Sequence, residues 1–469
     1  MTRSICPIHL LPAEVLIHIF TAAGLSAICP TAIDASHVRP LLDLPSVCKR
    51  WRHVVLTTHH VWSHIDVELG FDTKRNRARL RQVTQLWLER AQGGAGPLHF
   101  HFLGVSERAQ CNLPQMLSIL RPHADRISTL AFPRDSDEVA VQSILGLCMP
   151  GSISTLKLDG IWTDAHTDNH LVWAPNFYSN MICLDLARLT PELSPSFGQV
   201  IEILRNSPGL RKLRLRHMSL KRDNTFRSEL VNLPELRLLD LTGLADTTLV
   251  PLLQTLSPGS QSLFVRLGPS RNRRVLKGIQ SFFQHTNVEF LHFPCTETWD
   301  PKGPHLISLG PYLSSTANLR ALVLDLSSDE DLSKLDSLVL ANSTPACPIL
   351  ETLCIIGHCV DATGVDQLKR FIGVQRSLRR LVFINSDIRI YSNTIEEEED
   401  FKEHATMWLA EHVQKVVWDQ VAYSDSDKLI EHVERIVSYS YGRPISIRTS
   451  TLHPAVTKEC RVIEPPLSV

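Results

Sequence analysis

A short pattern of apolar residues recurs along most of the chain after residue 97. Each copy has an apolar residue, a leucine three positions later and another apolar residue two positions further on, as in Ile127, Leu130 and Phe132. After Leu130 the central leucines fall at 156, 184, 213, 239, 291, 322, 353 and 381, and a weaker copy at Leu263–Leu267 divides the longest interval. The other intervals, of 26 to 31 residues, have room for one strand and one helix each. The pattern predicts a curved stack, with parallel strands inside and helices outside.

This spacing is typical of a leucine-rich-repeat solenoid, which is an α/β fold. We expect it to cover residues 98–440 and to be followed by a tail at 441–469. The ninth position of the repeat departs from the usual Asn or Cys, because Ile161, Leu189, Met218 and Leu244 stand there in four successive copies. Packing of apolar side chains is therefore expected to hold the turns in place of an asparagine ladder, and the solenoid is expected to be irregular.

Alternation of side chains along each strand predicts which residues face the inner side of the stack. The fourth strand places three basic residues there, and neighbouring strands add carboxylates. One interpretation is a solvated face with weak ion pairs between strands. The other is a docking strip for an acidic or phosphorylated segment of a protein substrate, since arginine binds such groups well. The residues concerned are Lys157, Asp159, Asp185, Lys212, Arg214, Arg216, Asp240 and Asp325.

The last two copies place apolar residues at the equivalent inward positions, namely Cys354, Ile356, Val382 and Ile384. Exposure of such a patch to water is unfavourable, so either a partner or another part of the chain should cover it. We expect the cover to be the C-terminal segment between Trp408 and Trp418, which is rich in apolar residues.

The first seventy residues have a helical pattern instead. Pro12 and Glu14 suit the first turn of a helix, and the apolar residues at 15, 16, 19 and 20 form one stripe at helical spacing. A second amphipathic helix is expected from Leu44 to Val55, and a third short piece from Val61 to Asp66. Residues 21–43 have no clear period and are expected to be an insert, whereas 71–97 are expected to form a linking helix and turn.

Three ordered blocks in this region resemble an F-box. They are Leu-Pro-x-Glu-Val-Leu-x-x-Ile-Phe at residues 11–20, Val-Cys-Lys-Arg-Trp-Arg at 47–52 and Val-Trp-Ser-x-Ile at 61–65. The form with a long insert resembles F-box proteins of mushroom-type fungi, and the all-helical module would span residues 8–70. The resemblance implies docking on a Skp-type adaptor and, through it, on a cullin ubiquitin ligase.

Carried over by position, the resemblance implies adaptor binding by Leu11, Pro12, Glu14, Val15, Ile19, Phe20, Val47, Cys48 and Trp51. Trp62 would close the small core beneath them. A simpler interpretation remains open, in which these apolar residues only hold the three helices together.

Other classes of function have little support in the sequence. The pairs His99/His101 and His166/His170 and the group Cys347, Cys354, His358 and Cys359 match no complete zinc pattern, so we expect no metal and no cofactor. Phosphate-loop, dinucleotide-binding and hydrolase motifs are absent from the sequence, and we expect no enzymatic activity. The net charge of −1 makes nucleic acid an unlikely partner.

The cysteines and the targeting segments bear on the location of the protein in the cell. The eleven scattered cysteines suit a reducing compartment, and we expect neither a signal peptide nor a membrane span, hence a cytoplasmic or nuclear protein. The sequence therefore favours a substrate-recognition subunit of an SCF-type (Skp–cullin–F-box) ubiquitin ligase, with an unknown protein substrate. The alternative is a cullin-independent interaction scaffold with a degenerate F-box.

Overall fold

The computed structural model describes residues 11–28, 44–68, 74–94, 96–103, 113–161, 171–221, 229–268, 270, 272–294, 310–326, 347–357, 359–388, 395–419, 432–433 and 461–463. Two compact units divide the chain, one of Met1–Ser207 with Ser424–Leu452 and the other of Pro208–Tyr423 with His453–Val469. The division falls within the repeats, so the helical module and the first repeats belong to one unit. Each unit is described by itself.

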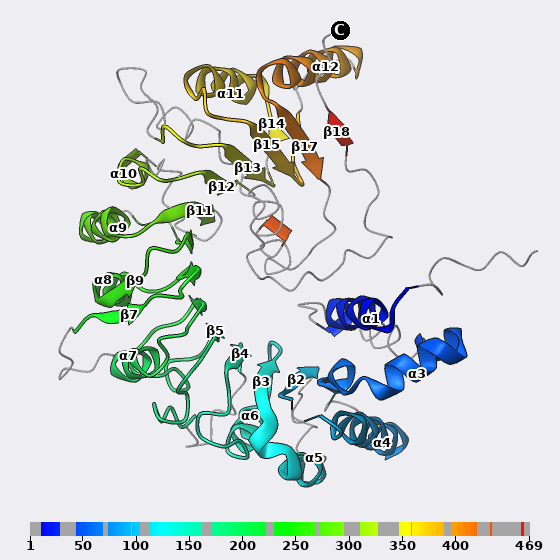
Figure 1. Ribbon diagram of the computed structural model, residues 1–469. Helices are drawn as coiled ribbons and strands as arrows, with labels where there is room; N and C mark the ends of the chain where they lie inside the picture. The colour runs from blue at the N-terminus through cyan, green and yellow to red at the C-terminus, as the bar shows by residue number, and fades with distance from the viewer. Residues whose placement is uncertain are drawn as a thin grey trace, which may run out of the picture. The chain divides into compact units, whose positions relative to one another are not determined.

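The described residues of unit 1 include five parallel strands, each hydrogen-bonded to the next in chain order. They are β1 (His64–Glu68), β2 (Leu98–Leu103), β3 (Ile127–Phe132), β4 (Thr155–Asp159) and β5 (Cys183–Ala187). The helices and short 3-10 turns are α1 (Ala13–Ile28), α3 (Lys49–Thr57), η3 (His59–Trp62), α4 (Lys74–Ala91), α5 (Leu113–Leu120), η5 (Arg121–Arg126), α6 (Glu138–Leu145) and α7 (Phe197–Arg205). Figure 1 shows α5 and α6 on the outer side of the strands that they connect.

Unit 2 has the same construction, and its described part includes eight parallel strands and one antiparallel strand at the end. They are β6 (Lys212–Arg216), β8 (Leu238–Asp240), β10 (Leu263–Arg266), β11 (Val288–Pro294), β12 (Ala321–Asp325), β13 (Thr352–Ile356), β15 (Arg380–Ile384), β17 (Lys415–Asp419) and the antiparallel β18 (Arg461–Ile463). Two short pairs accompany this sheet, β7 (Val231–Leu233) with β9 (Leu256–Pro258) and β14 (Cys359–Val360) with β16 (Asp387–Ile388).

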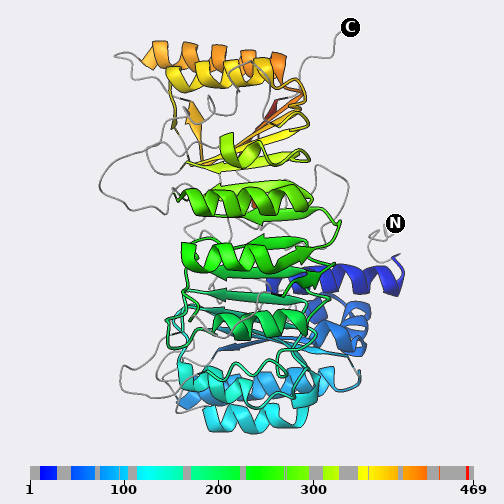
Figure 2. The ribbon, with the colours of Figure 1, turned by 90° about the vertical axis from the view of Figure 1, so that its left-hand side faces the viewer.

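The helices of unit 2 lie on one side of its sheet, where Figure 2 shows those coloured green, yellow and orange side by side. They are α8 (Asp246–Thr255), α9 (Arg273–His285), α10 (Gly310–Leu313), α11 (Ala362–Val374) and α12 (Ile395–His412). The prediction of an α/β repeat fold, with parallel strands inside and helices outside, is confirmed.

The central leucines explain this construction. All nine are fully buried. Within each unit they are register partners, as Leu130, Leu156 and Leu184 are in unit 1. In unit 2 the same row contains Val265 of the weaker copy, which pairs with Leu239 and Leu291. A one-residue slip of any strand would turn its leucines to the other face of the sheet, so the row fixes the register.

The turns after the strands pack through apolar residues, as expected, and several of them also contain a residue with a positive φ, which the sequence does not predict. The apolar ninth-position residues, from Ile161 to Leu244, are buried. Just beyond several strands the backbone takes a positive φ, at Gly160, Gly243 and Gly357 but also at Arg188 (φ 53°) and His217 (φ 50°). Because only glycine adopts this conformation without a steric penalty, the fold imposes the turn on Arg188 and His217 against their local preference.

Three predictions about the first hundred residues need correction. Helix α1 continues to Ile28, so the first part of the predicted insert at 21–43 is helical; residues 29–43 lie outside the described residues. The expected second helix is interrupted at Cys48, which has an extended backbone. The third piece is a single 3-10 turn followed by β1, which pairs with β2. The described part of the module is thus helical as far as Trp62, and its last segment, β1, starts the sheet.

The C-terminal region also differs from expectation. Cys354, Ile356, Val382 and Ile384 are buried, but the segment predicted to fold over them extends the repeat instead. Its first part belongs to α12, and Lys415–Asp419 forms β17, where Val417 is the register partner of Val382. The predicted tail also contributes β18, which pairs with β17.

Candidate functional site

Helix α1 places apolar residues on two neighbouring stripes, and the fold uses only one of them. Leu16 and Phe20 are fully buried, whereas Val15 and Ile19 are 39% and 40% exposed. Residues four apart in a helix lie on the same side, so Val15 and Ile19 form one exposed strip, here called the α1 stripe. Pro12 stands at the first turn of the helix, as predicted, and its carbonyl accepts a hydrogen bond from the N–H of Leu16.

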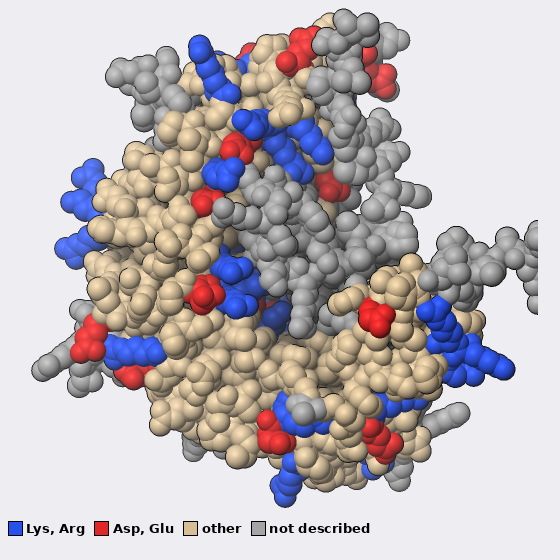
Figure 3. Space-filling view, in the orientation of Figure 1, with Lys and Arg blue, Asp and Glu red and all other residues tan. Residues whose placement is uncertain are grey.

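Helix α3 is connected to the start of α1. Cys48 caps α3, its Sγ accepting a hydrogen bond from the N–H of Trp51 at 3.4 Å. The guanidinium of Arg50 donates to the carbonyl oxygen of Leu11, and the ring of Trp51 meets Phe20 edge-on with centroids 4.9 Å apart. Val47, just before the cap, is 56% exposed. Figure 3 shows basic side chains gathered over α3 on the right of the view.

Trp62 and Trp87 form a small aromatic core that packs against α3. The indole N–H of Trp62 donates to the carbonyl of Val55 at 2.8 Å. Its ring meets Trp87 of α4 edge-on at 5.1 Å, and the guanidinium of Arg90 lies 4.3 Å from its centroid. A buried indole N–H usually has a hydrogen-bond partner, and for Trp62 that partner is a carbonyl near the end of α3.

The nine residues implied by the resemblance fall into three groups. Pro12, Glu14, Val15, Ile19 and Val47 are exposed, whereas Leu11, Cys48 and Trp51 are half-buried. Phe20 is fully buried and lies beneath the surface. Leu56 on α3, which the sequence analysis did not single out, is also exposed at 39%.

In unit 1 the predicted inner-face residues carry both charges. Lys157 and Asp185 are register partners on β4 and β5, and Asp185 is buried whereas Lys157 is half-buried. Asp159 forms an ion pair with Arg188, one of the residues with positive φ. The turn conformation thus brings a basic side chain to the end of β4.

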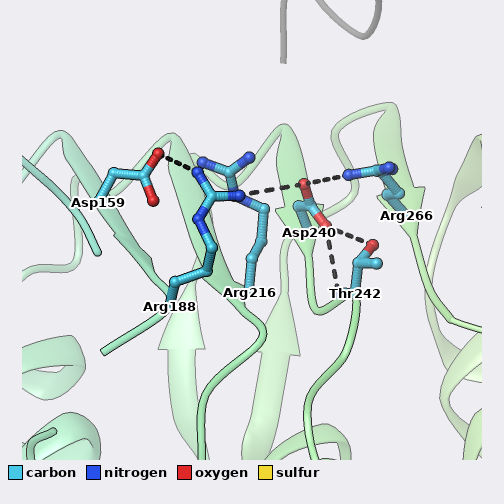
Figure 4. A network of polar contacts seen from close by, with 6 residues as sticks. All are labelled: Asp159, Arg188, Arg216, Asp240, Thr242 and Arg266. Carbon is cyan, nitrogen blue, oxygen red and sulfur yellow. Dashed lines mark hydrogen bonds and ion pairs between the residues drawn. The ribbon is translucent and has the colours of Figure 1, made fainter. Parts of the chain in front are cut away.

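In unit 2 one carboxylate holds two arginines (Figure 4). Asp240 Oδ2 lies 3.4 Å from Arg266 Nη1 and 4.0 Å from Arg216 Nε. The other oxygen, Oδ1, accepts hydrogen bonds from the N–H of Thr242 at 3.2 Å and from its hydroxyl at 2.8 Å. We call Arg216, Asp240, Thr242 and Arg266 the arginine network.

Burial distinguishes the arginine network from an ordinary charged surface. Arg214, Arg216 and Asp240 are buried, while Lys212 and Asp325 are half-buried. The expectation of an ion pair between strands fits Arg216 and Asp240, but the expectation that this face is solvated is wrong for these buried side chains. Arg266, a buried member of the network, escaped the sequence analysis because it belongs to the weak copy of the repeat.

Groups that could carry chemistry form no metal-binding cluster in the described part of the chain. Among the described residues, no three His, Cys, Asp or Glu side chains are placed to share a metal ion. His99 shares a hydrogen bond of 2.7 Å with the hydroxyl of Thr129 and stacks on His64. Burial raises the pKa of the Cys347 thiol to about 12, which makes it a poor nucleophile. His166, His170 and His358 lie outside the described residues.

No helix in the described part of the chain is long and apolar enough to span a bilayer.

Comparison with known proteins supports the N-terminal assignment. Residues 8–68 match the F-box-like family, so the chain contains an F-box-like domain there. None of the curated proteins matches the chain. Among solved structures, that of the Rad7 and Elc1 complex in yeast is similar over 80% of this chain and 90% of that one, at 12% identity and a TM-score of 0.38. The leucine-rich-repeat-containing protein LegL7 from Legionella pneumophila matches over 73% and 98%, at 12% identity and a TM-score of 0.29. A protein from Bacteroides fragilis matches over 74% and 71%, at 9% identity and a TM-score of 0.27.

Proposed function

We propose that this chain is the substrate-recognition subunit of an SCF-type ubiquitin ligase. Its F-box-like domain docks on a Skp-type adaptor, which connects it to a cullin, and its repeats bind a protein substrate. The chain itself catalyses no step. It raises the local concentration of the substrate near an enzyme that the rest of the complex recruits, so that transfer becomes nearly intramolecular. This role places the protein in the cytoplasm, the nucleus or both.

The observation that carries the proposal is the division of α1 into a buried stripe and an exposed one. Leu16 and Phe20 satisfy the internal core, so the fold does not need Val15 and Ile19, which remain exposed. With Val47 they place apolar area on the surface of a domain whose family docks on an adaptor. Exposed apolar area of this kind is typical of an interface with another protein.

Substrate contact is assigned to the inner face of the sheets. The half-buried residues Lys157, Asp159, Lys212 and Asp325 are accessible to a partner. The buried residues Asp185, Arg214, Arg216 and Asp240 add fixed charges to the same face. A protein segment with acidic groups fits the basic strand β6.

Co-purification tests the proposal. The full chain is expressed with a Skp-type adaptor and a cullin, and the complex is passed through gel filtration. We expect the adaptor and the cullin to elute with the chain, and the double variant Leu11→Arg with Pro12→Ala to lose both. Retention of the adaptor without the cullin would favour the interaction scaffold, and undiminished retention by the double variant would remove the docking assignment.

A further inference from the structure

Arg266 on β10 and His292 on β11 are register partners in unit 2. Register partners on neighbouring parallel strands extend from the same face of the sheet, with backbones about 5 Å apart. Both side chains are buried, with exposed fractions of 4% for Arg266 and 1% for His292. A cationic group and an imidazole are thus held side by side in a place from which bulk water is largely excluded.

Polar atoms of this pair have no hydrogen-bond partner within the described part of the chain. They are the Nε of Arg266 and both ring nitrogens of His292. Leaving a buried polar group unpaired destabilises a folded protein, and folded proteins pair nearly all such groups. Two of these nitrogens carry a proton, Nε of Arg266 and one ring nitrogen of the neutral His292, and lack an acceptor. They therefore indicate a place where a ligand supplies the missing acceptors.

Asp240 does not fill this role, because its two oxygens are already engaged. Oδ1 accepts both hydrogen bonds from Thr242, and Oδ2 is shared by Arg216 and by Nη1 of Arg266. Asp240 accepts a hydrogen bond from Nη1 of Arg266 and leaves Nε of Arg266 without an acceptor. Asp240 is therefore a positioning residue, which orients Arg266 without occupying all of its donors.

The charges of Arg266 and His292 determine which kind of ligand the pair can bind. Burial and the neighbouring Arg266 hold the pKa of His292 well below its usual range, so the ring is neutral and offers one N–H donor. On its other side the register partner of His292 is Val323 of β12, which has no charge. The pair therefore presents one full positive charge and several N–H groups, which repel a cation and suit an anion with several acceptor oxygens.

We propose that Arg266 and His292 form a binding site for a phosphate group, carried either by a small molecule or by a phosphorylated side chain. Arg266 donates from its Nε edge to the phosphate oxygens, and His292 donates from one ring nitrogen. The site lies outside the strip predicted on β6 and does not depend on adaptor docking by the F-box-like domain.

Calorimetric titration of the full-length protein with inorganic phosphate at constant ionic strength tests the site. We expect the wild type to bind phosphate and Arg266→Gln to bind it about ten-fold more weakly or not at all, because a charged hydrogen-bond donor is lost. Arg274→Gln is the matched control, since Arg274 lies exposed on α9 and the substitution removes the same charge. Its affinity should equal that of the wild type.

A second variant separates binding from folding. His292→Phe keeps a ring of similar shape and removes both unpaired nitrogen atoms. We expect it to unfold at the same temperature as the wild type or higher when phosphate is absent, and yet to bind phosphate more weakly. A residue that only packs in the core would not combine these two results.

A parallel titration with N-acetyl-phosphoserine amide tells whether the phosphate group belongs to a phosphorylated side chain or to a small molecule. Tighter binding of this compound than of inorganic phosphate assigns the site to a phosphorylated side chain, and binding of inorganic phosphate alone assigns it to a free phosphate compound. The proposal is overturned if the wild type binds neither probe. It is also overturned if the folded Arg266→Gln or His292→Phe variant binds as tightly as Arg274→Gln.

Discussion

His217 lies directly over Gly243 in successive turns of unit 2. A Cβ atom added to Gly243 would come within 2.4 Å of Nδ1 of His217, and Gly243 has a φ of +67°. Both the space and the backbone conformation therefore exclude a larger residue. The contact shows how one turn of the stack constrains the next.

Substitution of Gly243 should destabilise unit 2. We expect Gly243→Ala to lower the free energy of unfolding by about 1–3 kcal/mol, because the residue is strained and clashes with the ring. Denaturant unfolding of the full chain measures this change. Gly209→Ala is the control, since a Cβ at Gly209 meets no atom within 4 Å. The double variant Gly243→Ala with His217→Ala should recover part of the loss, and equal losses in both glycine variants would refute the steric explanation.

Phe20 should matter for folding and not directly for binding. Its ring is fully buried against Trp51, so Phe20→Ala should cost about 3–5 kcal/mol through lost burial and a cavity. Thermal unfolding followed by near-ultraviolet circular dichroism reports the loss at the tryptophans. Val15→Ala, on the exposed stripe, should leave the unfolding temperature nearly unchanged. If both variants were equally destabilised, the division of α1 into two stripes would be wrong.

Asp66 should make stability depend on pH. Burial raises its pKa from 3.8 to about 7, so the native state holds a proton that the unfolded chain releases. Because the native state binds more protons between these two values, stability should fall as the pH rises from about 4 to about 7 and then level off. Asp66→Asn should remove this fall and raise the unfolding temperature more at pH 8 than at pH 4. An identical pH profile in both proteins would exclude a neutral Asp66.

Removal of Asp240 should be more harmful than removal of one of its arginines. Asp240→Ala would leave Arg216 and Arg266 buried without the carboxylate that they share, at a cost of about 3–5 kcal/mol. Arg216→Met should cost less, because Asp240 keeps Arg266 and the two donors of Thr242. Urea unfolding of the two variants gives the comparison. A greater loss in Arg216→Met would show that Asp240 does not organise the network.

The repeat could be predicted because its signal is periodic. Each central leucine has the same environment, so burial of one row forces the same residue type at regular intervals, and all nine predicted strands are present. The turns could not be predicted in the same way. Arg188 and His217 adopt a positive φ against their local preference, because the stacked neighbours determine the path of the chain.

The candidate sites were only partly predictable, for a related reason. Alternation places Arg214, Arg216 and Asp240 on one face, but it does not tell whether that face is open or covered, and these side chains are buried. The residues of the α1 stripe are similar in type to the buried Leu16 and Phe20, so helical periodicity alone could not assign them to the surface. At Val61–Asp66 the sequence pattern predicts a short helix, because over so few residues a 3-10 turn that leads into a strand has a similar pattern.

The docking role of the α1 stripe is tested most directly by the affinity of the full chain for a purified Skp-type adaptor. The variant Val15→Glu with Ile19→Glu introduces charges on the stripe, and Leu86→Glu introduces one at an equally exposed position on α4 (Leu86, 40%). With unfolding temperatures unchanged, we expect the stripe variant to bind at least about 100-fold more weakly, because buried unpaired charges are costly, and Leu86→Glu to bind like the wild type. Wild-type affinity in the folded stripe variant would contradict the account.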